Sequence, residues 1–114
     1  MSILSDVKGS LGITSANTDF DSVLITYINS VFPTLGQLGI GPEEGFMITG
    51  DDDDWEDFYG SDLRYNNIQS YMYLRVRLLF DPPQIGFVIA AQERQVEQLE
   101  WRINMQREVN LANG

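Results

Sequence analysis

The apolar run YMYLRVRLLFDPP at residues 71–83 constrains the fold of this chain more than any other segment. It predicts a helix that begins at about Ser61 or Asp62, a good pair of capping residues, and ends near Phe80. The helix must stop there because the residue before a proline avoids the helical region. A helix that is apolar nearly all round must be buried nearly all round. We therefore expect this helix to be central, covered partly by its own chain and partly by identical neighbours.

The flanking segments predict three further helices. The first is expected at about residues 2–10. The second follows Thr18, where Asp21 completes a pattern close to a capping box, and Pro33 should kink or tighten it near its end. The last is expected over residues 83–109, with residues 108–114 fraying. Its narrow apolar seam has a heptad-like spacing: Ile89, Gln92, Val96, Leu99, Ile103 and Gln106.

Residues 40–61 lack a helical period and contain the aspartate run GDDDD between FMIT and WEDFY. This pattern favours either a loose hairpin or an ordered loop with an acidic tip in water or on a cation. The acids of this loop are Asp51, Asp52, Asp53, Asp54, Glu56 and Asp57. The fold class that we predict is mainly α: one domain over residues 1–114, a small four-helix bundle with this long loop between its second and third helices.

Composition narrows the function. The 114 residues include no cysteine and no histidine, and Lys8 is the only lysine. The commonest general base, the commonest metal ligand and any thiolate are therefore missing, so we expect no catalytic residue, no cofactor and no enzyme. No segment approaches the ~18 apolar residues of a membrane span, and no signal peptide is recognisable. We expect no membrane partner and a chain made in the cytoplasm.

The net charge of −10 is unevenly distributed. Residues 1–62 hold twelve acids and one lysine, whereas residues 63–114 hold five acids and six arginines. No basic patch is available to neutralise nucleic-acid phosphates. The acidic half could pair with the arginines within one chain, or with those of the next subunit in a head-to-tail contact. In the second case the subunit interface would include Tyr71, Tyr73, Arg75 and Arg77.

Two further sites are open to more than one interpretation. Trp101 could be a core residue, but its neighbours Arg102, Met105 and Arg107 give it the composition of a partner interface. The aspartate run does not fit the calcium-binding EF-hand loop, because Glu56 and Asp62 stand where glycine and glutamate are needed. We expect a solvated acidic loop and no metal. A calcium-binding module and a small acidic regulatory or DNA-mimic protein remain alternatives.

Three stretches together resemble the head–tail connector proteins, also called adaptor or head-completion proteins, of long-tailed bacteriophages. They are TDFDSVLITYINSVFPTLGQLGIGP at residues 18–42, IQSYMYLRVRLLFDPP at 68–83 and ERQVEQLEWRINMQRE at 93–108, with a tryptophan-containing acidic loop after the first. The resemblance covers most of residues 1–110. Its most specific parts, residues 71–83 and 98–106, are packing and interface patterns and not catalytic signatures.

The resemblance implies a helical virion protein with no enzymatic activity. Copies of it would form a ring, commonly twelvefold, beneath the portal in the virion neck, even where the isolated chain is a monomer. The ring would extend the DNA channel without binding DNA specifically and would present a docking surface to the next head-completion or tail protein. By similarity, the portal-facing surface would be formed by Trp101, Arg102, Met105, Gln106 and Arg107.

Overall fold

The computed structural model describes residues 2–113, with side chains described for residues 2–106. These residues form five helices: α1 (Ile3–Ser10), α2 (Asp21–Gln37), α3 (Trp55–Tyr59), α4 (Tyr65–Phe80) and α5 (Gly86–Asn113). The mainly α fold is confirmed, and the described residues contain no strand beyond an isolated bridge between Ser2 and Asp54. The predicted number of four helices is wrong, because α3 forms inside the acidic loop.

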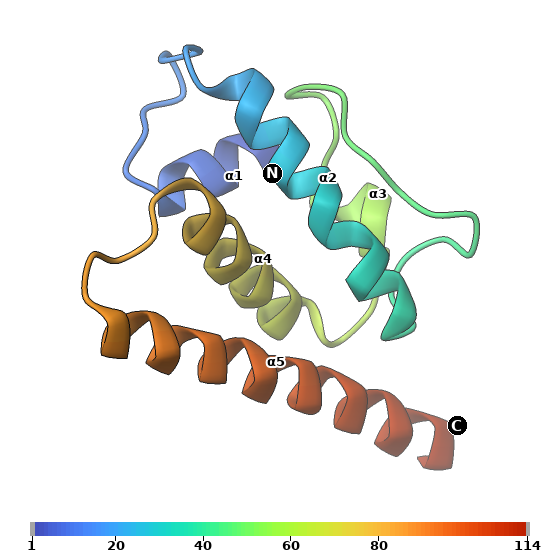
Figure 1. Ribbon diagram of the computed structural model, residues 1–114. Coiled ribbons are helices and arrows are strands. Elements are labelled where there is room, and N and C mark those ends of the chain that lie inside the picture. Colours follow the sequence, from blue (N-terminus) through green and yellow to red (C-terminus); the bar gives the residue numbers. More distant parts are fainter. Residues whose placement is uncertain (1, 114) are drawn as a thin grey trace.

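Helix α4 is central, as the apolar run predicts. It contacts α1 and α2 on one side and the long outer helix α5 on the other (Figure 1). Its inner face is buried through Ile68, Tyr71, Met72 and Val76. The chain does not cover α4 completely, because Leu79 is 45 % exposed and the side chains beyond that inner face are only partly buried.

Each of the other long helices buries one apolar stripe against α4 or its neighbours, as expected for amphipathic helices. In α2 the buried residues recur every three or four positions: Leu24, Ile28, Val31, Phe32 and Leu35. In α5 the predicted seam is confirmed at Val96 and Ile103, which are buried, and at Leu99, which packs against the core. Helix α5 packs chiefly on α4, so most of its circumference remains at the surface.

Helix α2 does not begin with the predicted capping box at Thr18. Its N-cap residue is Phe20, which makes no side-chain capping bond. Asp21 instead lies 2.8 Å from the buried ammonium of Lys8, which also donates to the Ser15 carbonyl. Burying an ammonium without a partner costs free energy. Asp21 therefore pairs with Lys8 instead of capping the N-terminus of α2. The helix accommodates Pro33 and continues to Gln37.

The predicted starts of the last two helices were also several residues early. Helix α4 begins at Tyr65 and not at Ser61 or Asp62, because the Asp62 carboxylate turns to accept hydrogen bonds from Arg64. Helix α5 begins at Gly86, after an extended linker that contains both prolines. It runs to Asn113. The fraying predicted for residues 108–114 stays a prediction.

The acidic loop is ordered and is not a hairpin. Ile48 is fixed to α2, since the Asn29 amide donates to its carbonyl at 3.0 Å and accepts from its N–H at 2.8 Å. The segment WEDFY forms α3, which buries Trp55 and Phe58 against the core. Gly41 makes this packing possible: its φ is +84°, and a Cβ there would lie 2.4 Å from Cε1 of Phe58.

Candidate functional site

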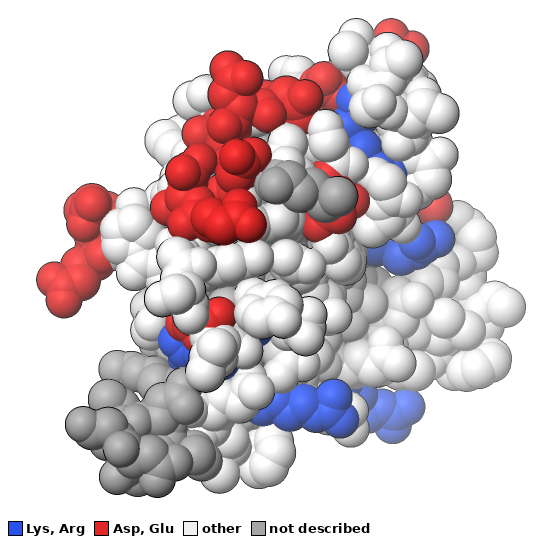
Figure 2. Space-filling view, turned by 180° about the vertical axis from the view of Figure 1, so that it is seen from behind, with Lys and Arg blue, Asp and Glu red and all other residues white. Residues whose placement is uncertain are grey.

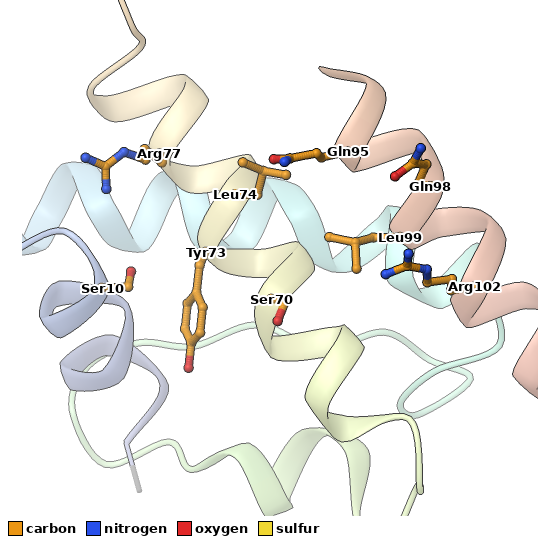
Figure 3. Close-up of a pocket in the computed structure, with 9 residues that line it drawn as sticks. All are labelled: Ser10, Ser70, Tyr73, Leu74, Arg77, Gln95, Gln98, Leu99 and Arg102. Atoms are coloured by element: carbon orange, nitrogen blue, oxygen red, sulfur yellow. The ribbon is translucent and has the colours of Figure 1, made fainter. Parts of the chain in front are cut away.

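A groove of about 470 Å³ lies where α1, α4 and α5 meet (Figure 3). It is lined by Ser10, Ser70, Tyr73, Leu74, Arg77, Gln95, Gln98, Leu99 and Arg102. Figure 3 shows Leu74 and Leu99 between the two arginines, which lie toward opposite ends. We call this the arginine groove. It combines an apolar floor with two cations and several amide and hydroxyl groups.

Both arginines of the groove are exposed, and neither forms an ion pair with a residue whose side chain is described. In contrast, the buried Lys8 and Arg64 each have a carboxylate partner. The cations that the fold needs are thus neutralised inside the chain. Arg77 and Arg102 remain available to an external anion.

The four predicted subunit-interface residues separate in space. Arg77 lies in the arginine groove, but Arg75 is on another side of α4, where it donates to the Tyr71 hydroxyl at 2.5 Å and lies over its ring. That hydroxyl donates in turn to a Glu100 carboxylate oxygen at 3.0 Å. The Tyr71 side chain is fully buried. In the single chain this tyrosine therefore joins α4 to α5 and fixes Arg75, rather than presenting a surface of its own.

Tyr73 also points into its own chain. Its hydroxyl donates a short hydrogen bond to the Asp6 carboxylate, which also accepts from the Trp55 indole at 2.8 Å. Asp6 thereby joins α1, α3 and α4. Burial, followed by this hydrogen bond to a carboxylate, raises the pKa of Tyr73. Burial likewise raises the pKa of Tyr71 to about 12, against the opposing effect of Arg75.

The predicted partner interface on α5 lies at the surface. Trp101 is 64 % exposed, Met105 is 36 % exposed, and Arg102 is exposed beside them. Gln106 is exposed and accepts a hydrogen bond from the Asn67 amide at 3.0 Å. The side chain of Arg107 lies outside the described residues. An exposed tryptophan next to methionine and arginine is the composition that interfaces favour.

The acidic loop uses several of its carboxylates to fix its own shape. Asp51 accepts from the hydroxyls of Ser2 at 2.6 Å and Ser5 at 2.5 Å, and these bonds lower the pKa of Asp51. Asp53 accepts from the Thr49 N–H at 2.8 Å. Within the loop, Asp57 accepts from the Asp54 N–H at 3.0 Å. Asp52 is exposed and has no hydrogen bond or ion pair with any described residue.

Figure 2 shows where the two charges gather. Acidic side chains cover one region of the face in view, and basic side chains lie mainly along another part of it, toward α5. Within the described residues, no group of three or more acids is arranged to hold a metal ion. Nor does any helix among them combine the length and apolarity needed to cross a bilayer.

Arg64 is the structurally important residue that the sequence interpretation missed. Its side chain is 5 % exposed and donates to the carbonyls of Leu38, Gly39 and Ile103, besides binding Asp62 at 2.6 Å. It therefore joins the end of α2, the start of α4 and α5. One signal was available: a cation at a helix N-terminus is unfavourable, so an arginine there needs acceptors elsewhere.

The described residues form a small helical protein whose surface carries the arginine groove and the exposed side chains of α5. Comparison with protein families gives a match to the phage connector protein family over residues 3–110. The match spans nearly the whole chain, and the chain belongs to this family. The resemblance inferred from its sequence is thereby confirmed. No curated protein and no solved structure matches it.

Proposed function

We propose that this protein is a structural component of the phage neck that forms a ring under the portal and joins the head to the tail. The observation that carries the proposal is the family match over residues 3–110, which includes all of α1 to α4 and most of α5. The ring would be twelvefold in the virion. It would assemble in the host cytoplasm and contact the portal on one side and a downstream head-completion or tail protein on the other.

The portal-facing surface that we propose is the exposed side of α5 at Trp101, Arg102, Met105, Gln106 and Arg107. Trp101 and Met105 expose apolar area that the chain itself does not cover. Burying such aromatic and sulfur-containing side chains in a partner pocket is the usual energetic core of an interface. The flanking arginines would add orientation through polar contacts.

Ring closure is supported by what α4 leaves uncovered and by the division of charge. A head-to-tail contact repeated about an axis closes into a ring, and opposite charges on two parts of one surface favour such a contact. The exposed residues of α4 include Arg77, in the arginine groove, and Leu79, which is 45 % exposed. Arg75 is partly buried and could contact a neighbour from the other side, positioned by Tyr71.

The proposed passage of DNA through the ring needs a wall that does not hold phosphate. The net charge of −10 and the surface acids over the loop suit such a wall, because anionic surfaces repel the DNA backbone. Specific DNA binding is not part of the proposal. It would require a continuous basic surface, whereas the described arginines are dispersed over α4 and α5.

Co-assembly with the portal protein of the same phage tests the function. The purified chain and the portal would be mixed and examined by electron microscopy and native mass spectrometry. We expect a ring of chains stacked on the portal. Trp101→Ala should weaken this complex at least about tenfold, as for a hot-spot aromatic, while Phe87→Ala, at an equally exposed aromatic near the start of α5, serves as the matched control. Absence of any portal complex with the unmodified chain would refute the proposed function.

A further inference from the structure

We propose that the arginine groove of one copy receives the acidic loop of the next copy, with Asp52 among the carboxylates that pair with Arg77 and Arg102. This inference rests on the proposed ring and identifies the contact that would close it. The two arginines lie toward the ends of an apolar floor formed by Leu74 and Leu99 (Figure 3). An acidic segment with several carboxylates fits this arrangement better than a single small anion, because it can supply carboxylates at both ends.

The groove has the charge that such a segment needs. Lys8 and Arg64 each form an ion pair within the chain, and Arg75 donates a hydrogen bond to Tyr71. Arg77 and Arg102 form no ion pair with a described side chain, and both line the same depression. Arginine is well suited to such a contact because its planar guanidinium can bind a carboxylate through two parallel hydrogen bonds.

The acidic loop has the matching properties. Its backbone is fixed to α1, since Ile3 N–H donates to the Asp53 carbonyl at 3.0 Å and both Ser2 and Ser5 donate to the Asp51 carboxylate. Such pre-organisation lowers the entropy lost on binding. Asp52, at the middle of this fixed segment, is exposed and has no hydrogen bond or ion pair with any described residue. The loop thus presents a carboxylate outward on a rigid support.

The placement of the two surfaces makes a second copy the appropriate occupant. On the face shown in Figure 2, most acidic side chains gather in one region and the basic ones lie mainly elsewhere. No hydrogen bond or ion pair within the chain joins Asp52 to either groove arginine. A surface and its complement at separate places on one molecule create a head-to-tail contact between copies. The other possible occupant, an acidic segment of a portal or tail protein, is separated from this one by the experiment below.

The experiment is a charge exchange in the full chain, followed by analytical ultracentrifugation and by assembly on the portal. Chain one carries Arg77→Glu and Arg102→Glu; chain two carries Asp52→Arg. Each alone should associate with itself about tenfold more weakly or worse, as expected for close charge pairs at an interface. Mixing the two chains should restore association, because each loop then meets a groove of opposite charge. High salt should weaken the association of the unmodified chain.

Matched controls are available on the same helices and loops. Arg94→Glu changes an exposed arginine of α5 outside the groove, and Glu44→Arg changes an exposed acid outside residues 51–57. Both controls should associate like the unmodified chain. All substituted residues are exposed, and circular dichroism would verify that each variant is folded.

The outcomes separate this inference from the proposed function. If the unmodified chain assembles on the portal but the groove and loop variants do so equally well, the inference is wrong and the function stands. The inference also fails if each variant is impaired and mixing restores nothing, because the groove then binds an acidic segment of another protein. Both proposals are wrong if the unmodified chain assembles neither alone nor on the portal.

Discussion

The guanidinium of Arg64 lies 2.6 Å from the carboxylate of Asp62, two residues earlier in the chain, and the carboxylate directs it into the contact between three helices. From that position Arg64 binds backbone carbonyls of Leu38, Gly39 and Ile103. The Asp62–Arg64 pair therefore connects α4 to the end of α2 and to α5. It adds a buried hydrogen bond to the packing that attaches α5 to the other helices.

Arg64→Met should destabilise the protein by about 3 kcal/mol or more. The substitution removes donors to buried carbonyls and leaves Asp62 without its cation, and breaking a buried pair typically costs about 3–5 kcal/mol. Denaturant unfolding monitored by circular dichroism would measure the change. Arg94→Met, at an exposed position of α5, should change the free energy of unfolding by no more than about 0.5 kcal/mol. Equal effects at the two positions would contradict the role given to Arg64.

Low pH should weaken the Asp62–Arg64 pair. Burial of Asp62 opposes ionisation, but its hydrogen bonds from Arg64 outweigh that effect and hold the pKa of this carboxyl below its ordinary value of 3.8. A depressed folded-state pKa contributes stability that is present above pH 3.8 and is lost as the pH falls through the folded-state value. Asp62→Asn should therefore flatten the decline in unfolding free energy between about pH 5 and pH 2. An unchanged slope would argue against this linkage.

Alkali should act through Tyr71. Its pKa is raised by burial from 10.0 to about 12, so the neutral hydroxyl is favoured in the folded state. That contribution is complete below pH 10 and is lost as the pH rises from 10 to about 12. Tyr71→Phe should reduce the alkaline loss of stability, whereas Tyr65→Phe, at a tyrosine that is 43 % exposed, serves as the matched control. Ultraviolet titration of the phenolate together with unfolding measurements would test this expectation.

Gly41→Ala should destabilise the acidic loop and its attachment to α2. The backbone at this position has a positive φ, which alanine adopts only with strain, and the new Cβ would overlap the Phe58 ring. Overpacking of this kind costs about 1–3 kcal/mol. Gly36→Ala is the matched control, since a Cβ there meets nothing within 4 Å. Because Gly36 is inside α2, the control should be neutral or stabilising by up to about 1 kcal/mol. Similar losses at both glycines would contradict the argument.

The long helices could be predicted from sequence because their apolar residues recur with a helical period over many turns. Residues 71–80 are long and apolar enough to define a helix, and the seam at Val96, Leu99 and Ile103 defines both a helix and its buried face. Helix α3 could not be predicted in this way. It has five residues, and its buried pair Trp55 and Phe58 gives a single repeat, which fits a strand or a loop equally well.

The arginine groove lay beyond sequence reasoning for a different reason. Arg77 and Arg102 come from different helices. Whether they line the same groove depends on how α4 and α5 cross and on the rotation of each helix about its axis. The role of Arg64 was missed because most of its hydrogen-bond acceptors are backbone carbonyls. Every residue type has such a carbonyl, so the sequence does not indicate which ones Arg64 contacts. The capping prediction for α2 was wrong because Asp21 forms an ion pair with Lys8 instead of capping the helix.

The burial of Lys8 has a practical consequence for the study of this protein. It is the only lysine of the chain, it is 3 % exposed, and its ammonium is held by Asp21 and Ser15. Amine-directed reagents should therefore acylate this side chain only when α1 separates from the start of α2. Mass spectrometry of the slowly formed Lys8 adduct would then measure how often α1 separates from the start of α2 in the native protein.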